Sequence, residues 1–332
     1  MRINEKHDII GISTIGCEGK VIAKQKKKVE PPIGFVEFAA KYSTEEACRE
    51  KLFEVRKANG FKCLRCEGED FYHLKTRGTF QCKKCKYQQS LTVGTVMEGT
   101  HLKLQKWFWA IYLVATDKRG YSATGLMKQL HIGYKNAWFL LQRIREAMGQ
   151  RDERYMLCGI IEFDDAYFGG TKPGGKRGRG TAKTKGLVAV SKDDAGKPKY
   201  LKLLAVPNFK GKTIKKFAEK YFIEGALVET DACRSYRKAL EEKFLHEWQI
   251  FDADAEMLGW LHTVISNVKA AFNGTFHGLD GKHMQRYFDE ISYRFNRRYM
   301  ERDIFDHLLS ATTLATPLHF AVLCPPKLAE KK

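Results

Sequence analysis

Residues 158–180 read CGIIEFDDAYFGGTKPGGKRGRG, and this stretch decides the fold and chemistry expected for the chain. The short apolar run at residues 159–163 predicts a buried strand, which two adjacent carboxylates, Asp164 and Asp165, bring to an end. Packing fixes the position of a carboxylate at the end of a buried strand. Such a carboxylate can therefore hold a divalent cation.

A glycine-rich loop follows this strand, and its cationic side chains would suit a polyanionic substrate. They are Lys172, Lys176, Arg177 and Arg179. On this stretch alone, the alternative is a β-hairpin with a solvated basic loop, so the rest of the chain has to decide between the two interpretations.

Composition indicates a basic globular protein. The 332 residues suffice for two or three domains, and 58 Lys and Arg against 39 Asp and Glu give a formal charge of +19. This excess indicates a polyphosphate partner such as DNA or RNA, although a merely basic protein would share it. No apolar run approaches the roughly 20 residues of a membrane helix, so we expect no membrane partner. Nine cysteines without an export signal predict a reducing, cytoplasmic location.

Four of the cysteines form a metal-binding pattern. Cys63-x2-Cys66 and Cys82-x2-Cys85 are separated by fifteen residues, and two such knuckles complete a tetrahedral zinc site without an open position. We therefore predict a structural Zn²⁺ in a zinc ribbon at residues 61–100. The alternative is a redox or coincidental pairing.

The flanking segments are read as a basic, poorly ordered leader at residues 1–34, an N-terminal helix at 35–60 and a helical region at 101–150. Within the helical region, the pattern from residue 121 predicts helix, glycine-containing turn and helix. Lys135 and Asn136 open the second helix, where base contacts occur in helix-turn-helix proteins. An ordinary helical hairpin is the alternative.

From residue 155 the pattern becomes α/β. A three-strand meander is followed by a helix, a fourth strand, a helix and a fifth strand, which is the order of a ribonuclease-H-like mixed sheet. The fourth strand, residues 226–230, also precedes a carboxylate, Asp231. In this fold Asp164 and Asp231 would lie on neighbouring strands and could hold the metal ions that phosphodiester chemistry uses. A third ligand should come from a later helix, where Asn267 follows Asp231 after thirty-five residues.

The chain resembles bacterial insertion-sequence transposases of the DDE type, in the subgroup that carries an N-terminal zinc ribbon. The resemblance runs in order over about residues 35–312. After the two CxxC pairs, it rests on SLTVGTVMEGTHLKLQKWFWAIYL, SATGLMKQLHIGYKNAW, IEFDDAYFGG, GGKRGRG, TDACRSY, LHTVISNVK, GTFHGL and HMQRYFDEISYRFNRR.

The resemblance implies a ribonuclease-H-like catalytic domain at residues 155–312, before a tail at 313–332, with Mg²⁺ or Mn²⁺ as cofactor. It implies cleavage and joining of double-stranded DNA, at the terminal inverted repeats and at a target, by a homodimer or higher oligomer on the bacterial nucleoid. Asp164 and Asp231 would be the first two catalytic acids, and Asn267 would occupy the third position. The four cysteines named above would bind zinc.

One departure concerns this third position, where the family usually has Glu; some members of the subgroup share the Asn. Asp165 and Glu290 are candidates for a compensating acid. Weaker predictions concern DNA contacts by Lys269, Arg297 and Arg298. Two alternatives remain: a non-catalytic DNA-binding protein derived from such an element, and a nuclease of the same fold.

Overall fold

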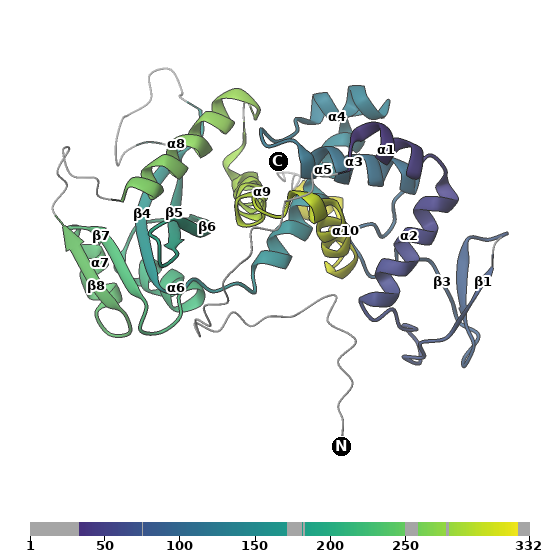
Figure 1. The fold of residues 1–332 in the computed structure, drawn as a ribbon, viewed down its shortest axis with the longest axis horizontal. Coiled ribbons are helices and arrows are strands. Elements are labelled where there is room, and N and C mark those ends of the chain that lie inside the picture. The colour runs from purple at the N-terminus through teal and green to yellow at the C-terminus, as the bar shows by residue number, and fades with distance from the viewer. Residues whose placement is uncertain are drawn as a thin grey trace, which may run out of the picture.

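The structure is a computed structural model that describes residues 33–74, 76–170, 181, 183–249, 258–276 and 279–324. The loop with Lys176, Arg177 and Arg179 lies outside these residues. Figure 1 shows a half built around a large sheet and a half built from helices and a small sheet. In the described part of the chain, no helix is long and apolar enough to cross a membrane.

The N-terminal segment contains two helices rather than the single helix expected at 35–60. They are α1 (Phe35–Lys41) and α2 (Glu45–Ala58). The break occurs at Thr44, whose hydroxyl caps α2 by accepting a hydrogen bond from the Ala47 N–H at 3.2 Å. The small antiparallel sheet that follows contains β1 (Phe71–Leu74), β2 (Thr79–Cys82) and β3 (Gln88–Gln89).

Three further helices form the centre of the helical half: α3 (Leu104–Thr116), α4 (Ala123–Leu130) and α5 (Tyr134–Asp152). The Ser122 hydroxyl caps α4 by accepting from the Gly125 N–H at 3.0 Å. A short turn joins α4 to α5, and His131 in this turn adopts a left-handed conformation with φ of 49°. The predicted order of helix, turn and helix is therefore present.

The large sheet has the strand order β6-β5-β4-β7-β8. Its strands are β4 (Ile160–Phe168), β5 (Thr184–Lys192), β6 (Pro198–Val206), β7 (Leu227–Asp231) and β8 (Leu245–Gln249). The first three form an antiparallel meander, and β7 and β8 run parallel to β4. This is the predicted ribonuclease-H-like arrangement. However, β4 continues past Asp164 to Phe168, because those residues stay paired with β5.

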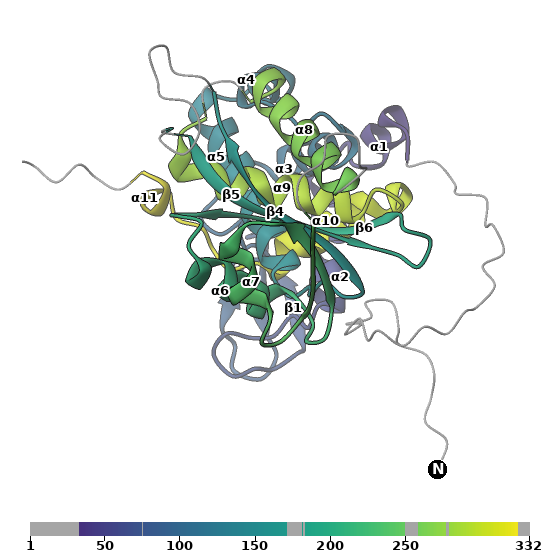
Figure 2. The same ribbon diagram turned by 90° about the vertical axis from the view of Figure 1, so that its left-hand side faces the viewer.

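Helices cover both faces of this sheet (Figure 2). On one face lie α6 (Gly211–Tyr221) and α7 (Arg234–Leu240), whose apolar side chains pack with Ile161 and Phe163. On the other lie α8 (Gly259–Gly274) and α9 (Met284–Asn296), which pack with Ala166 and Phe168. Because successive side chains of a strand point to opposite faces, Asp164 lies on the α8 face and Asp165 on the α6 and α7 face.

The last long helix, α10 (Ile304–Leu314), packs in the helical half. Its residues Phe305 and Leu308 share a hydrophobic core with Phe108 of α3 and Ile144 of α5. The expected catalytic range of 155–312 therefore includes a helix whose apolar contacts belong to the N-terminal core. A final short helix, α11 (Phe320–Leu323), lies against α5 through ring contacts between Phe320 and the side chains of Trp138 and Phe139.

Candidate active site and zinc site

Two carboxylates lie at the same level on adjacent parallel strands of the large sheet. In the register of β4 and β7, Glu162 pairs with Glu229. Asp164 and Asp231 follow these residues by two positions, so both project from the same face. Since parallel strands are about 4.8 Å apart, side chains at this level can share a cation. Asp164 and Asp231 therefore lie on neighbouring strands, as the ribonuclease-H-like order predicted.

The electrostatics of this pair favour a bound cation. The pKa of Asp164 is raised to about 7: burial is the largest cause and the carboxylates of Asp165 and Asp231 add to it, while a hydrogen bond from the Asp165 N–H and the charge of Lys269 oppose the change. The charge on Asp164 is thus costly without a partner of opposite sign. Hard divalent cations such as Mg²⁺ and Mn²⁺ prefer oxygen ligands of this kind, so the donor set fits the implied metal.

Helix α8 lies beside this pair and carries Asn267 and Lys269, both of which are exposed. Its buried stripe against the sheet consists of Leu261, Val264, Ile265, Val268 and Phe272. At about 100° per residue, Asn267 and Lys269 are roughly 200° apart around the helix and flank this stripe on opposite sides. Lys269 is close enough to lower the pKa of Asp164. Among the described residues, no hydrogen bond joins the Asn267 amide to either carboxylate.

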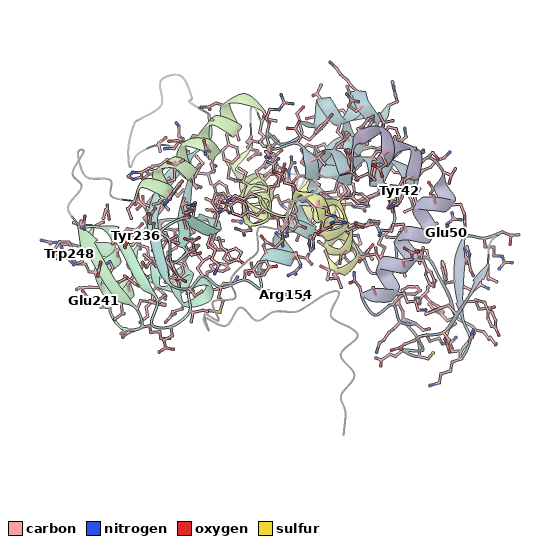
Figure 3. All side chains as sticks on the ribbon, viewed as in Figure 1. Tyr42, Glu50, Arg154, Tyr236, Glu241 and Trp248 are labelled. Carbon is pink, nitrogen blue, oxygen red and sulfur yellow. The ribbon has the colours of Figure 1, made fainter. Side chains whose placement is uncertain are left out.

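Asp165 and Glu290, the two acids considered as substitutes for the third metal ligand, both lie elsewhere. Asp165 is on the opposite face of the sheet and accepts a hydrogen bond from the Tyr236 hydroxyl at 3.1 Å. Figure 3 labels Tyr236 in the half built around the large sheet. Burial raises the pKa of Tyr236, and the nearby carboxylates add to this, so the hydroxyl remains a donor. Glu290 of α9 is fully buried and forms an ion pair of 2.6 Å with Arg145. Both acids therefore have partners of their own.

The structure adds a residue that the sequence motifs do not single out. Gln249, at the end of β8, pairs directly with Asp231 and is exposed. Asp164, Asp231 and Gln249 therefore form one row across three strands on the α8 face, and Gln249 offers an amide oxygen at its end. The sequence could have indicated Gln249, because it ends the strand that follows β7 just as Asp231 ends β7.

The four cysteines of the double CxxC pattern converge in the small sheet. The Sγ atoms of Cys63 and Cys85 are 3.5 Å apart, as are those of Cys66 and Cys82, and all four lie within 4.8 Å of one another. Zinc–sulfur bonds of about 2.3 Å in a tetrahedron require sulfurs roughly 3.8 Å apart. The arrangement fits one structural zinc ion with no open position.

The two knuckles share a backbone geometry that supports this interpretation. Glu67 and Lys86, the residues after each second cysteine, have positive φ angles of 56° and 62°. Their N–H groups donate to the carbonyls of Cys63 and Cys82 at 2.8 and 3.0 Å. Hydrogen bonds, foremost one from the Cys85 N–H, lower the pKa of Cys82 to about 7, which favours the thiolate that zinc binds.

The predicted DNA contacts divide into two groups. Lys135 and Asn136 are exposed at the first turn of α5, and the Lys135 ammonium lies 4.6 Å from the centroid of the Phe320 ring. Arg297, in contrast, is 5% exposed and forms an ion pair of 2.7 Å with Asp152. This burial contradicts a DNA contact by Arg297 in the observed conformation.

Arg298 also has partners within the protein. Its guanidinium donates hydrogen bonds to the main-chain carbonyls of Pro198, Lys199 and Phe295. It thereby joins the segment after α9 to the beginning of β6, which argues against its predicted role on DNA. A pattern of alternating aromatic and cationic residues on a helix does not distinguish these internal roles from DNA binding.

Comparisons with known proteins match both halves of the chain. Residues 156–296 match the family model described as ISXO2-like transposase domain, and residues 43–88 match that described as transposase zinc-ribbon domain. An uncharacterized protein in transposable element ISH50 of Halobacterium salinarum is 28% identical over 129 residues. These residues make up 38% of this chain and 42% of the relative, so the chain spans less than half the length of that protein.

One solved structure is similar at low identity. The Mos1 transposase paired-end complex with left transposon end aligns with 63% of this chain and 79% of its own chain, at 14% identity. The TM-score of 0.23 is too low to relate the two arrangements in detail. The strand order of the large sheet and the two matched domains carry more weight.

Proposed function

Because this chain belongs to the insertion-sequence transposases that carry a zinc ribbon, we propose that it cuts DNA at the terminal inverted repeats of its element and joins the cut ends to target DNA. The observation that carries this proposal is the position of Asp164 and Asp231 at one level of adjacent parallel strands. This pair lies in a ribonuclease-H-like sheet and within the electrostatic reach of Lys269.

Within this proposal, each residue of the row has a role at the reacting phosphate. Bound Mg²⁺ or Mn²⁺ would activate the attacking oxygen and stabilise the leaving oxygen. Asp164 and Asp231 would hold the metal through their carboxylates, and Asn267 would supply an amide oxygen from α8. Gln249 is a further amide ligand available in the row. Lys269 would contact a DNA phosphate beside Asp164.

The zinc ribbon and the region of α4 and α5 would bind the DNA ends. On the ribbon, Tyr72 is 52% exposed, and the ammonium groups of Lys83 and Lys86 lie 5.4 and 5.7 Å from its ring centroid. Such a surface can contact phosphates and the edge of a groove. Lys135 and Asn136 would contribute from the first turn of α5. The loop with Lys176, Arg177 and Arg179 keeps its proposed role on the substrate.

We expect the active species to be a homodimer or higher oligomer in the cytoplasm. Transposition joins two ends of one element to one target, so two catalytic sites acting together account for both joining steps. Sedimentation of the protein with and without end DNA would measure this assembly. A single copy on each end throughout the reaction would contradict it.

A strand-transfer assay with the element's own ends tests the proposed chemistry. Purified protein with Mg²⁺ or Mn²⁺ should give joined products, whereas Asp164→Ala and Asp231→Ala should give neither cleavage nor joining and still bind the ends. Glu224→Ala is a matched control, because Glu224 is an exposed acid that precedes β7 at the end of the strand away from Asp231. Cut ends without joined products would identify a nuclease. Binding without cleavage, which a neutral third position would explain, would identify a DNA-binding protein.

A further inference from the structure

A second layer of charged side chains lies next to the catalytic row on the same face of the sheet. It consists of Glu162 on β4, Glu229 on β7 and Lys192 on β5. The Lys192 Nζ atom is 2.6 Å from a Glu229 carboxylate oxygen and 3.5 Å from one of Glu162. The Glu162 side chain is 4% exposed, so its charge is held inside the protein. A buried carboxylate requires partners of this kind.

Glu162 also holds the beginning of α8. Its second carboxylate oxygen accepts a hydrogen bond of 2.7 Å from the Leu261 N–H, in the first turn of that helix. The first N–H groups of a helix have no partner within the helix, and a negative charge there also interacts favourably with the helix dipole. Leu258, which precedes the helix, provides no side-chain cap. Glu162 therefore serves as the cap from a neighbouring strand.

This layer contacts the three elements that carry Asp164, Asp231 and Asn267. Glu162 and Glu229 pair directly and precede Asp164 and Asp231 by two positions on their strands. The hydrogen bond to Leu261 adds α8, which carries Asn267 and Lys269. Without the Lys192 ammonium, two carboxylates on adjacent strands would repel each other beside a row that already concentrates negative charge.

We propose that Glu162 and Lys192 are positioning residues that fix α8, and with it Asn267, relative to Asp164 and Asp231. This inference rests on the proposed function, since it assumes that these three residues bind the metal. Neither Glu162 nor Lys192 touches the metal or DNA in this account. Their effect on the reaction passes through the position of α8.

Binding of Mn²⁺ alone to the full zinc-loaded chain, measured by calorimetry and by electron paramagnetic resonance, tests this inference. Glu162→Asp retains the charge but withdraws the carboxylate by one methylene from Leu261. We expect it to weaken Mn²⁺ binding about tenfold, the lower end of the range for groups that orient metal ligands. Glu162→Gln, which retains an acceptor of the same length, should restore most of the affinity. Lys192→Met, which leaves Glu162 and Glu229 without their shared cation, should also weaken Mn²⁺ binding. Lys215→Met is its matched control, because it removes a lysine of α6 whose ion pair with Glu242 is exposed.

A double-mutant cycle separates positioning from general stability. If Glu162 acts through Asn267, then Glu162→Asp should weaken Mn²⁺ binding no further once Asn267→Ala is present. Additive losses in the double variant would overturn the inference, as would unchanged Mn²⁺ affinity in Glu162→Asp. Equal losses of Mn²⁺ affinity and melting temperature in Glu162→Asp and Glu162→Gln would also overturn it. Absence of Mn²⁺ binding by the wild-type protein would instead reject the metal site of the proposed function.

Discussion

Replacing Asp164 with Asn should stabilise the metal-free protein while abolishing its activity. The substitution keeps the size of the side chain and removes its charge. In the folded protein the pKa of Asp164 is raised from 3.8 to about 7, chiefly by burial and further by Asp165 and Asp231. The unfolded chain therefore loses this proton at a lower pH than the folded chain. As pH rises from about 4 to about 7, this difference lowers the free energy of unfolding.

The pKa difference sets the size of the effect. About three pH units between the unfolded and folded pKa values correspond to ~4 kcal/mol of lost stability in the folded protein. This loss is fully present above pH 7 and absent below pH 4. We take this value as the upper limit of the gain in Asp164→Asn at pH 8. At pH 5 the gain in the free energy of unfolding should be less than half as large. Most of the interval between the unfolded pKa of 3.8 and the folded pKa of about 7 lies above pH 5.

Urea unfolding of both proteins at pH 5 and pH 8 measures this difference. The buffers should be free of Mg²⁺ and Mn²⁺ but contain no chelator, since a chelator would remove the structural zinc. Added Mn²⁺ should then stabilise the wild-type protein at pH 8 and leave Asp164→Asn unchanged. Glu224→Gln, at an exposed position before β7, controls for the loss of one negative charge. An equal gain at both pH values, or equal stabilisation of both proteins by Mn²⁺, would refute the reasoning.

Three further predictions concern the zinc site, the DNA surface and the end of β8. Cys82→Ser should lose the bound zinc and unfold the small sheet while the large sheet stays folded, as zinc analysis and limited proteolysis would reveal; a folded ribbon without zinc would contradict this. Lys135→Ala should weaken end binding and lower the dependence of its logarithm on log salt by about one, measured by fluorescence anisotropy across salt concentrations. Gln249→Glu should tighten Mn²⁺ binding and Gln249→Ala should weaken it in calorimetry, and unchanged affinity in both would remove Gln249 from the site.

The topology of the large sheet was predictable because it depends on local signals. Alternating apolar residues and turn residues give the meander, and a helix between two strands requires a parallel crossover. The crossover fixes the direction of β7, and it was the ribonuclease-H-like order of the elements that predicted β7 beside β4 and so Asp231 near Asp164. The end of β4 was not predictable in this way. Asp164 and Asp165 resemble a strand terminus, but β4 continues because Asp165 and the residues after it pair with β5.

The roles of the charged residues in α9 and directly after it depend on partners far away in the sequence. Arg297 forms its ion pair with Asp152, and Glu290 forms its ion pair with Arg145. Each pair joins α9 to α5 across 145 positions of the chain. Helical periodicity assigns such residues to a face but does not say whether DNA or another helix covers it. Local sequence therefore predicted the two aspartates better than it predicted the arginines.

These ion pairs also join α5, which is proposed to bind the DNA end, to the helix that packs on the proposed catalytic sheet. Helix α9 packs on β6 of the large sheet and on α5, and α10 continues the chain into the core formed by α3 and α5. Removing one partner of a buried ion pair typically costs about 3–5 kcal/mol because the other charge stays buried, so Arg145 and Glu290 favour the packing of α5 and α9 that keeps them paired. The exposed first turn of α5, proposed to hold the DNA end, is thus held in a defined orientation relative to the sheet that carries Asp164. A DNA end bound there would approach the carboxylate row from one direction, which gives the scissile phosphate a fixed path to the metal site.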